Sequence, residues 1–196
     1  ALYALAAYGS WGVVPLFWKL LEGVAATEIL AHRVAWSLVF IVGLLAATGK
    51  VSKARAVFSS PKTLRLLLVS SALIAVNWGV FIWAVMVNRL VDASLGYFIN
   101  PLVSVVMGVV ILRERLRRLQ WIAVALGALG LAIMFFARGG GLVVALTLAL
   151  SFAAYGLCRK IAQVESLVGL FVETLLSAPI AIAYLAYREA AGEGIV

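Results

Sequence analysis

The 196-residue sequence contains few of the residues from which catalytic and metal sites are built. It has one cysteine, Cys158, one histidine, His32, and one aspartate, Asp92. A single cysteine forms no intramolecular disulfide, one cysteine with one histidine is poor material for a metal site, and a lone aspartate excludes an aspartyl dyad. The sequence also lacks a glycine-rich phosphate-binding loop and an HExxH motif. We therefore expect no enzyme activity, no catalytic residue, no metal site and no cofactor.

Charged residues are scarce as well. They make up 12% of the chain, hydrophobic residues make up 65%, and the mean hydropathy is +1.13. A soluble domain of this size needs more polar surface, so lipid is the solvent that suits the chain. The net charge of +8 comes from cations in short loops between apolar runs, where they contact lipid headgroups rather than nucleic acid. The sequence therefore predicts an all-α, polytopic transmembrane helix bundle.

Seven apolar stretches are long enough to cross about 30 Å of hydrocarbon at a rise of about 1.5 Å per residue. The first stretch lacks the basic leader and the small-residue cleavage site of a signal peptide, so we expect it to be a retained helix. The connections are short, and most carry glycine, proline, lysine or arginine. The predicted helices lie near residues 2–19, 28–48, 64–87, 93–112, 119–137, 142–158 and 167–187.

Lysine and arginine are distributed unevenly between the two sides of the predicted bundle. Eleven of the 16 fall in the loops after the second, fourth and sixth helices, and five fall on the opposite side. Because cytoplasmic loops carry an excess of these residues, we expect the N-terminus in the cytoplasm. The eleven are Lys50, Lys53, Arg55, Lys62, Arg65, Arg113, Arg115, Arg117, Arg118, Arg159 and Lys160, and the five are Lys19, Arg33, Arg89, Arg138 and Arg188.

A weak internal echo links the first and sixth predicted helices. Ser10-Trp11-Gly12 followed by Lys19 is similar to Ala154-Tyr155-Gly156 followed by Arg159-Lys160. A repeat with an odd number of helices enters the membrane from the other side in its second copy, as in many secondary transporters. The alternative is that apolar helices resemble one another through composition alone.

The internal repeat divides the chain into two parts. We expect residues 1–137 to form a first five-helix repeat and residues 138–196 to hold the first two helices of a second. The second repeat is then incomplete in this chain, because three further helices would be needed to finish it.

Glu173 lies about two turns into the last predicted helix. An ionised carboxylate deep in hydrocarbon costs on the order of 3 kcal/mol or more, so such residues usually face a cavity, pair with a cation or bind a proton. The alternative is that Glu173 lies shallow on the cytoplasmic side and reaches the headgroups. We expect it to be a substrate-binding or proton-binding residue.

Other polar and aromatic side chains also interrupt the apolar runs. Asn100 and the aromatic residues are candidates to line a pocket for a flat organic ligand, with ordinary helix packing as the alternative. His32 and Arg33, near the outer end of the second predicted helix, are candidates for gating or for contact with an anionic group. For His32 the alternative is packing, and for Arg33 it is snorkelling to the interface. The expected substrate-binding set is Asn77, Trp78, Tyr97, Asn100, Tyr155 and Glu173.

Two strings in the sequence are similar to a known family. The runs ASLGYFINPL, from Ala93 to Leu102, and ERLRRLQW, from Glu114 to Trp121, resemble the EamA family of the drug/metabolite transporter superfamily, and most closely its RarD-like branch. Further matching pieces are His32–Ser37, Asn77-Trp78, Ser151–Lys160 and Gly169–Thr174.

The resemblance implies a ten-helix transporter of the bacterial inner membrane, built from two inverted five-helix repeats. It implies that a small metabolite or drug crosses by alternating access. In such a transporter we expect Glu173 to be the proton or substrate-cation site. The chain departs from this pattern because the last three helices are absent, so a non-transporting membrane scaffold or assembly protein is the alternative function.

Overall fold

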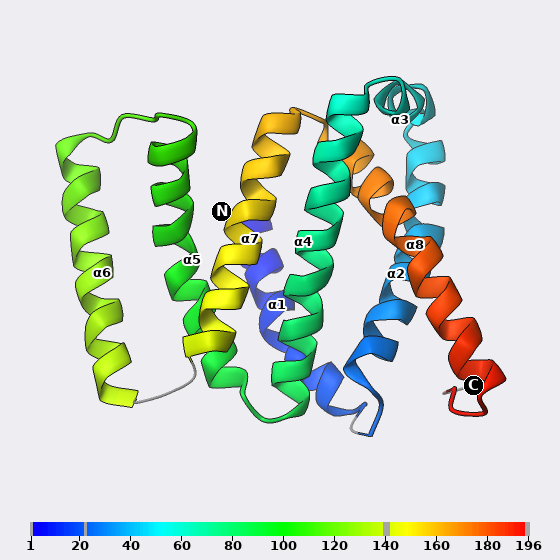
Figure 1. The fold of residues 1–196 in the computed structure, drawn as a ribbon, viewed down its shortest axis with the longest axis horizontal. Helices are drawn as coiled ribbons and strands as arrows, with labels where there is room; N and C mark the ends of the chain where they lie inside the picture. Colours follow the sequence, from blue (N-terminus) through cyan, green and yellow to red (C-terminus); the bar gives the residue numbers. More distant parts are fainter. Residues whose placement is uncertain (1, 22, 139–141, 195–196) are drawn as a thin grey trace.

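The computed structural model describes residues 2–21, 23–138 and 142–194. Over these ranges the chain is entirely helical, with eight helices and no β-strand. Figure 1 shows the long helices standing roughly side by side, with the short helix α3 at one end. The helices are α1 (Leu2–Lys19), α2 (Ala26–Ala47), α3 (Val51–Phe58), α4 (Pro61–Met86), α5 (Leu90–Ile111), α6 (Arg118–Arg138), α7 (Leu142–Ala162) and α8 (Ser166–Ala190).

A helix forms at each of the seven positions where a membrane span is predicted. Five of them, α2, α4, α5, α7 and α8, are long and apolar enough to cross a membrane, judged on the described residues. The chain is therefore a multi-pass membrane protein of the all-α class. That α1 and α6 also cross the membrane stays a prediction.

The additional helix, α3, lies in the connection between α2 and α4. Ala54 and Val57 are buried on one side of it, against Leu45, Leu67 and Val168 of the neighbouring helices. Eight residues are too few to cross a bilayer and too few to be stable as an isolated helix in water. Packing against the bundle therefore decides its conformation, and this is why the apolar pattern alone does not predict it.

The central helix of the bundle is α4. It begins where the Ser60 hydroxyl accepts a hydrogen bond from the Thr63 N–H, with Pro61 in the first turn, which is a favourable helix start. It packs against α7, α8 and α2, while α5 packs along the far side of α7. Helix α6 lies at the edge beside α5 (Figure 1).

The lysine-rich and arginine-rich loops lie together. Figure 1 shows the α2–α4 connection, the α5–α6 loop and the α7–α8 loop at the same end of the bundle, which we call the cation-rich end. The other end is called the opposite end. The arrangement agrees with the predicted alternation of loops, although Arg138 contributes only its backbone to the described structure. A cytoplasmic N-terminus stays a prediction.

Two clusters of buried apolar side chains close the two ends of the bundle. At the cation-rich end, Leu45, Leu67 and Val172 belong to a cluster shared by α2, α3, α4 and α8. At the opposite end, Trp18 and Phe81 belong to a cluster shared by α1, α2, α4, α5 and α7. Both ends of the bundle therefore have a buried apolar core.

Candidate functional site

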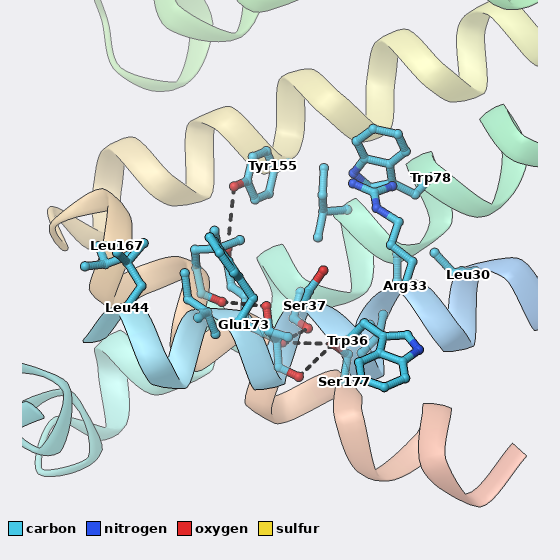
Figure 2. Close-up of a pocket in the computed structure, with 18 residues that line it drawn as sticks. Leu30, Arg33, Trp36, Ser37, Leu44, Trp78, Tyr155, Leu167, Glu173 and Ser177 are labelled. Atoms are coloured by element: carbon cyan, nitrogen blue, oxygen red, sulfur yellow. Dashed lines mark hydrogen bonds between the residues drawn. The ribbon is translucent and has the colours of Figure 1, made fainter. Parts of the chain in front are cut away.

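A cavity of about 620 Å³ lies between α2, α4, α7 and α8. We call it the main cavity. Figure 2 shows Arg33 and Trp78 at one end of it, Leu44 and Leu167 at the other, and Glu173 between them. A volume of this size suits a small organic ligand. Most of the wall is apolar, and the polar groups that line it are Arg33, Ser37, Ser71, Tyr155, Glu173, Thr174 and Ser177.

Glu173 extends from α8 into the bundle, where its side chain is only 3% exposed. The Ser70 hydroxyl of α4 donates a hydrogen bond to Glu173 Oε1 at 2.5 Å. The Tyr155 hydroxyl of α7 donates to Oε2 at 3.5 Å, as the dashed line in Figure 2 shows. The carboxylate is therefore held between two neighbouring helices. This geometry does not fit the alternative in which it reaches the headgroups.

A cation also approaches Glu173, at the cation-rich side. Arg159 Nη1 lies 3.6 Å from Glu173 Oε1, which is an ion pair without a hydrogen bond at that nitrogen. Arg159 comes from the end of α7 and crosses α8 at Gly169, where a Cβ atom would overlap the guanidinium. Arg159 Nη2 also donates to the Ser166 carbonyl at 3.4 Å. Gly169 therefore makes room for this approach.

The backbone at Glu173 is held as well. The Ser71 hydroxyl of α4 donates to the Glu173 carbonyl at 2.8 Å, and the Ser177 hydroxyl, one turn further along α8, donates to the same carbonyl at 3.0 Å. Buried polar groups in a membrane helix need such partners because no water is available in the hydrocarbon. The contact fixes the position of Glu173 relative to α4.

Arg33 occupies the other end of the main cavity. Its guanidinium carbon lies 3.2 Å from the centre of the Trp78 ring, which is a cation–π contact. The Trp78 ring also stacks against the Trp11 ring, and the two ring centres are 4.9 Å apart. Arg33 Nη1 is buried and has no hydrogen-bond partner within the part of the chain that the structure describes.

Three of the predicted residues lie outside the main cavity. Asn77, Tyr97 and Asn100 line a separate small pocket of about 10 Å³, roughly the space of one water molecule. The Asn77 amide donates to the Leu148 carbonyl and to the Ser151 hydroxyl, both at 2.9 Å, and so joins α4 to α7. A role of these three residues in substrate binding stays a prediction.

His32 lies in another pocket, of about 280 Å³, at the opposite end of the bundle. Glu28 and Glu189 line the same pocket. Glu28 is 2% exposed, and its Oε2 lies 3.1 Å from Nη2 of Arg188, which joins the start of α2 to the end of α8. His32 and its neighbour Arg33 therefore face different spaces, and a gating role for either residue stays a prediction.

The structure brings Trp78, Tyr155, Glu173 and Arg33 to one cavity. Sequence reasoning missed three partners of Glu173: Ser70, Ser71 and Arg159. The adjacent serines in the middle of an apolar run were the available signal for α4. Arg159 gave no such signal, because a cation at a helix end is sufficiently explained by membrane orientation.

Among the described residues, no three His, Cys, Asp or Glu side chains gather in a way that could hold a metal ion.

Comparison with known proteins gives consistent matches. Residues 1–136 match the EamA-like transporter family. The protein RarD of Escherichia coli is 46% identical over 184 residues, which cover 94% of this chain and 62% of the relative. An uncharacterized transporter of Vibrio cholerae is 46% identical, with 94% of this chain and 61% of the relative covered.

A more distant relative is the chloramphenicol-sensitive protein RarD of Pseudomonas aeruginosa. It is 34% identical over 201 residues, which cover 96% of this chain and 67% of the relative. The chain spans about three fifths of the length of the first two relatives. No solved structure matches the chain.

Proposed function

The chain belongs to the EamA-like transporter family, and from that premise we propose that it forms part of a secondary transporter for small metabolites or drugs. We place it in the bacterial inner membrane with its N-terminus in the cytoplasm. Substrate enters the main cavity from one side and leaves from the other by alternating access. Support comes from the family membership and from the size and position of the cavity.

The observation that carries the proposal is the position of Glu173. A buried carboxylate on the wall of a cavity, contacted by hydroxyls from two other helices, is suited to binding a proton or a substrate cation. Protonation removes the attraction to Arg159 and leaves the Ser70 contact in place. Binding at Glu173 therefore changes the interaction between α7 and α8.

We propose that the chain has the repeat plan that the sequence predicts. Residues 1–137 form a first five-helix repeat, and residues 138–196 begin a second one in the inverted orientation. Trp78 and Tyr155 contact the substrate in the main cavity, and Asn77, Tyr97 and Asn100 contact it when the helices rearrange. This proposal is supported by the family match to residues 1–136 and by the shared α4–α7 contact at Asn77.

The test uses Glu173→Gln, which keeps the shape of the side chain and removes its charge. Flux is measured in proteoliposomes across a pH gradient, first with chloramphenicol, the compound in the name of the Pseudomonas aeruginosa relative, and then with a panel of labelled metabolites. We expect a loss of flux of at least tenfold and a loss of its pH dependence. The matched control is Glu114→Gln, at an exposed glutamate that pairs with Lys160.

Wild-type flux with wild-type pH dependence in Glu173→Gln would remove Glu173 from the mechanism. A thermal-shift screen of the same panel in detergent tests the scaffold alternative. A transporter is stabilised by at least one compound that it carries, whereas a scaffold without a binding site is stabilised by none.

A further inference from the structure

We propose that the main cavity binds a singly charged organic anion with an apolar body, and that Arg33 holds the anionic group. The inference rests on the proposed function, because it assigns a substrate class to the same cavity. It is carried by the charge of the wall, the geometry of Arg33 and the apolar character of the remaining surface.

The charge on the cavity wall is not balanced. Among the described residues that line it, Arg33 and Glu173 are the charged ones. Glu173 is already accompanied by Arg159, at 3.6 Å, while no carboxylate in the described ranges lies within ion-pair distance of Arg33. Counted together with Arg159, the described residues at the cavity carry two positive charges and one negative charge, so the charge of Arg33 is uncompensated. In surroundings of low dielectric constant, such a charge attracts an anion strongly.

The geometry of Arg33 leaves hydrogen-bond donors free. A guanidinium is planar, and its N–H groups point outward in the plane. Trp78 covers one face of the plane at 3.2 Å, so the cation–π contact uses none of these donors. Nη1 is buried without an acceptor in the described structure. A carboxylate that reaches the guanidinium from the cavity would give it an acceptor and neutralise its charge in one contact.

The remaining wall selects the body of the ligand. Beyond Arg33 the cavity is lined by apolar side chains such as Phe40, Ile41 and Ile74. These groups favour an aromatic or aliphatic body over a hydrated one. A second negative charge on the ligand would face Glu173, which repels it. A monoanion with an apolar body therefore fits better than a polyanion or a sugar.

The test compares three probes that share one ring system. Indole-3-acetate, indole-3-acetamide and tryptamine carry charges of −1, 0 and +1 near neutral pH and are similar in size. Binding is measured by isothermal titration to the protein in lipid nanodiscs. We expect the acetate to bind at least tenfold more tightly than the acetamide, and tryptamine to bind most weakly.

Arg33→Gln is the decisive variant, and Arg55→Gln, at an exposed arginine of the cation-rich end, is its matched control. We expect the difference between acetate and acetamide to disappear in Arg33→Gln and to persist in Arg55→Gln. Arg33→Lys keeps the charge but loses the planar donor group, and we expect it to retain part of the preference. Helix content and thermal stability show whether each variant is folded.

Equal binding of acetate and acetamide by the wild-type protein would overturn the inference, as would the absence of acetate binding at millimolar concentration. An unchanged preference in folded Arg33→Gln would overturn it too. The two proposals fail separately. An Arg33-dependent preference without any flux in proteoliposomes contradicts the transport function alone, whereas Glu173-dependent flux without an acetate preference contradicts the substrate class alone.

Discussion

The guanidinium of Arg159 lies against the backbone of Gly169, in the space that a Cβ atom would occupy. This contact lets a cation at the end of α7 approach Glu173 across the surface of α8. Any side chain at position 169 would displace the guanidinium from this position. The glycine therefore serves the electrostatics of the site rather than a turn of the backbone.

The first prediction concerns this contact. Gly169→Ala should be less stable than its control by the equivalent of up to about 1 kcal/mol, because the added methyl group displaces the Arg159 guanidinium, a flexible side-chain end that moves aside and loses its present contacts. Gly156→Ala in α7 is the control, since its Cβ would have no heavy atom within 4 Å, and alanine favours a helix by about 1 kcal/mol over glycine. Thermal unfolding in detergent measures both variants. Equal stability of the two would show that the Arg159 position is not constrained by Gly169.

The second prediction concerns the buried pair at the opposite end. Glu28→Gln should destabilise the protein by about 1–3 kcal/mol, because it removes a buried charge-assisted contact, while Arg188 keeps its exposed partner Glu193. Arg188 also contacts Glu193, whose side chain is 60% exposed. Glu193→Gln should cost less than about 1 kcal/mol, since exposed pairs contribute little. Chemical denaturation of the two variants in the same detergent compares them, and similar losses would contradict the prediction.

The third prediction concerns the close contact between α5 and α7. A Cβ atom at Gly96 would lie 2.9 Å from Leu148 Cβ and 3.1 Å from the Ala145 carbonyl oxygen. Gly96→Ala should therefore separate the two helices and cost about 1–3 kcal/mol of stability. Gly130→Ala in α6 meets no atom within 4 Å and should be neutral or stabilising. A neutral Gly96→Ala would mean that α5 packs less closely than the structure has it.

The fourth prediction is a pH dependence at the cation-rich end. Hydrogen bonds from Lys50 and Lys53 lower the pKa of Glu165 below its ordinary value of 4.5. A carboxyl whose pKa is lowered by folding stabilises the folded state above its unfolded pKa, and this contribution is lost as the pH falls through the folded value. Melting temperatures of the wild-type protein and of Glu165→Gln should therefore differ at pH 7 and converge as the pH falls below 4.5 and through the lower pKa of the folded state. A constant difference over that range would contradict the assignment.

The positions of the membrane helices could be predicted from the sequence because each is a long apolar run between polar or turn-forming residues. Helix α3 could not, since its conformation depends on the contacts of Ala54 and Val57 with other helices. Glu173 could be selected from the sequence as a candidate site residue because a carboxylate in an apolar run is costly unless it is shielded. In each case the predictable part is the part with a strong local energetic signal.

The partners of Glu173 could not be predicted for a related reason. Ser70 also donates to the Leu67 carbonyl of its own helix, so its hydroxyl has a local partner and needs no other. Spacing places Asn100 one turn from Gly96 on α5, but it does not say which helix covers that face. The contacts between helices depend on rotations about their axes, and no single apolar run specifies them.

The two buried glutamate–arginine pairs lie toward the two ends of α8. Arg159 reaches Glu173 from α7 near the cation-rich end, and Glu28 of α2 holds Arg188 at the opposite end. Pro179 lies inside α8 between the two pairs and removes one hydrogen bond from its backbone, so the two halves of the helix are held to different neighbours on either side of a weak point. Spectroscopic labels beside the two pairs would therefore show whether the halves of α8 move together or separately.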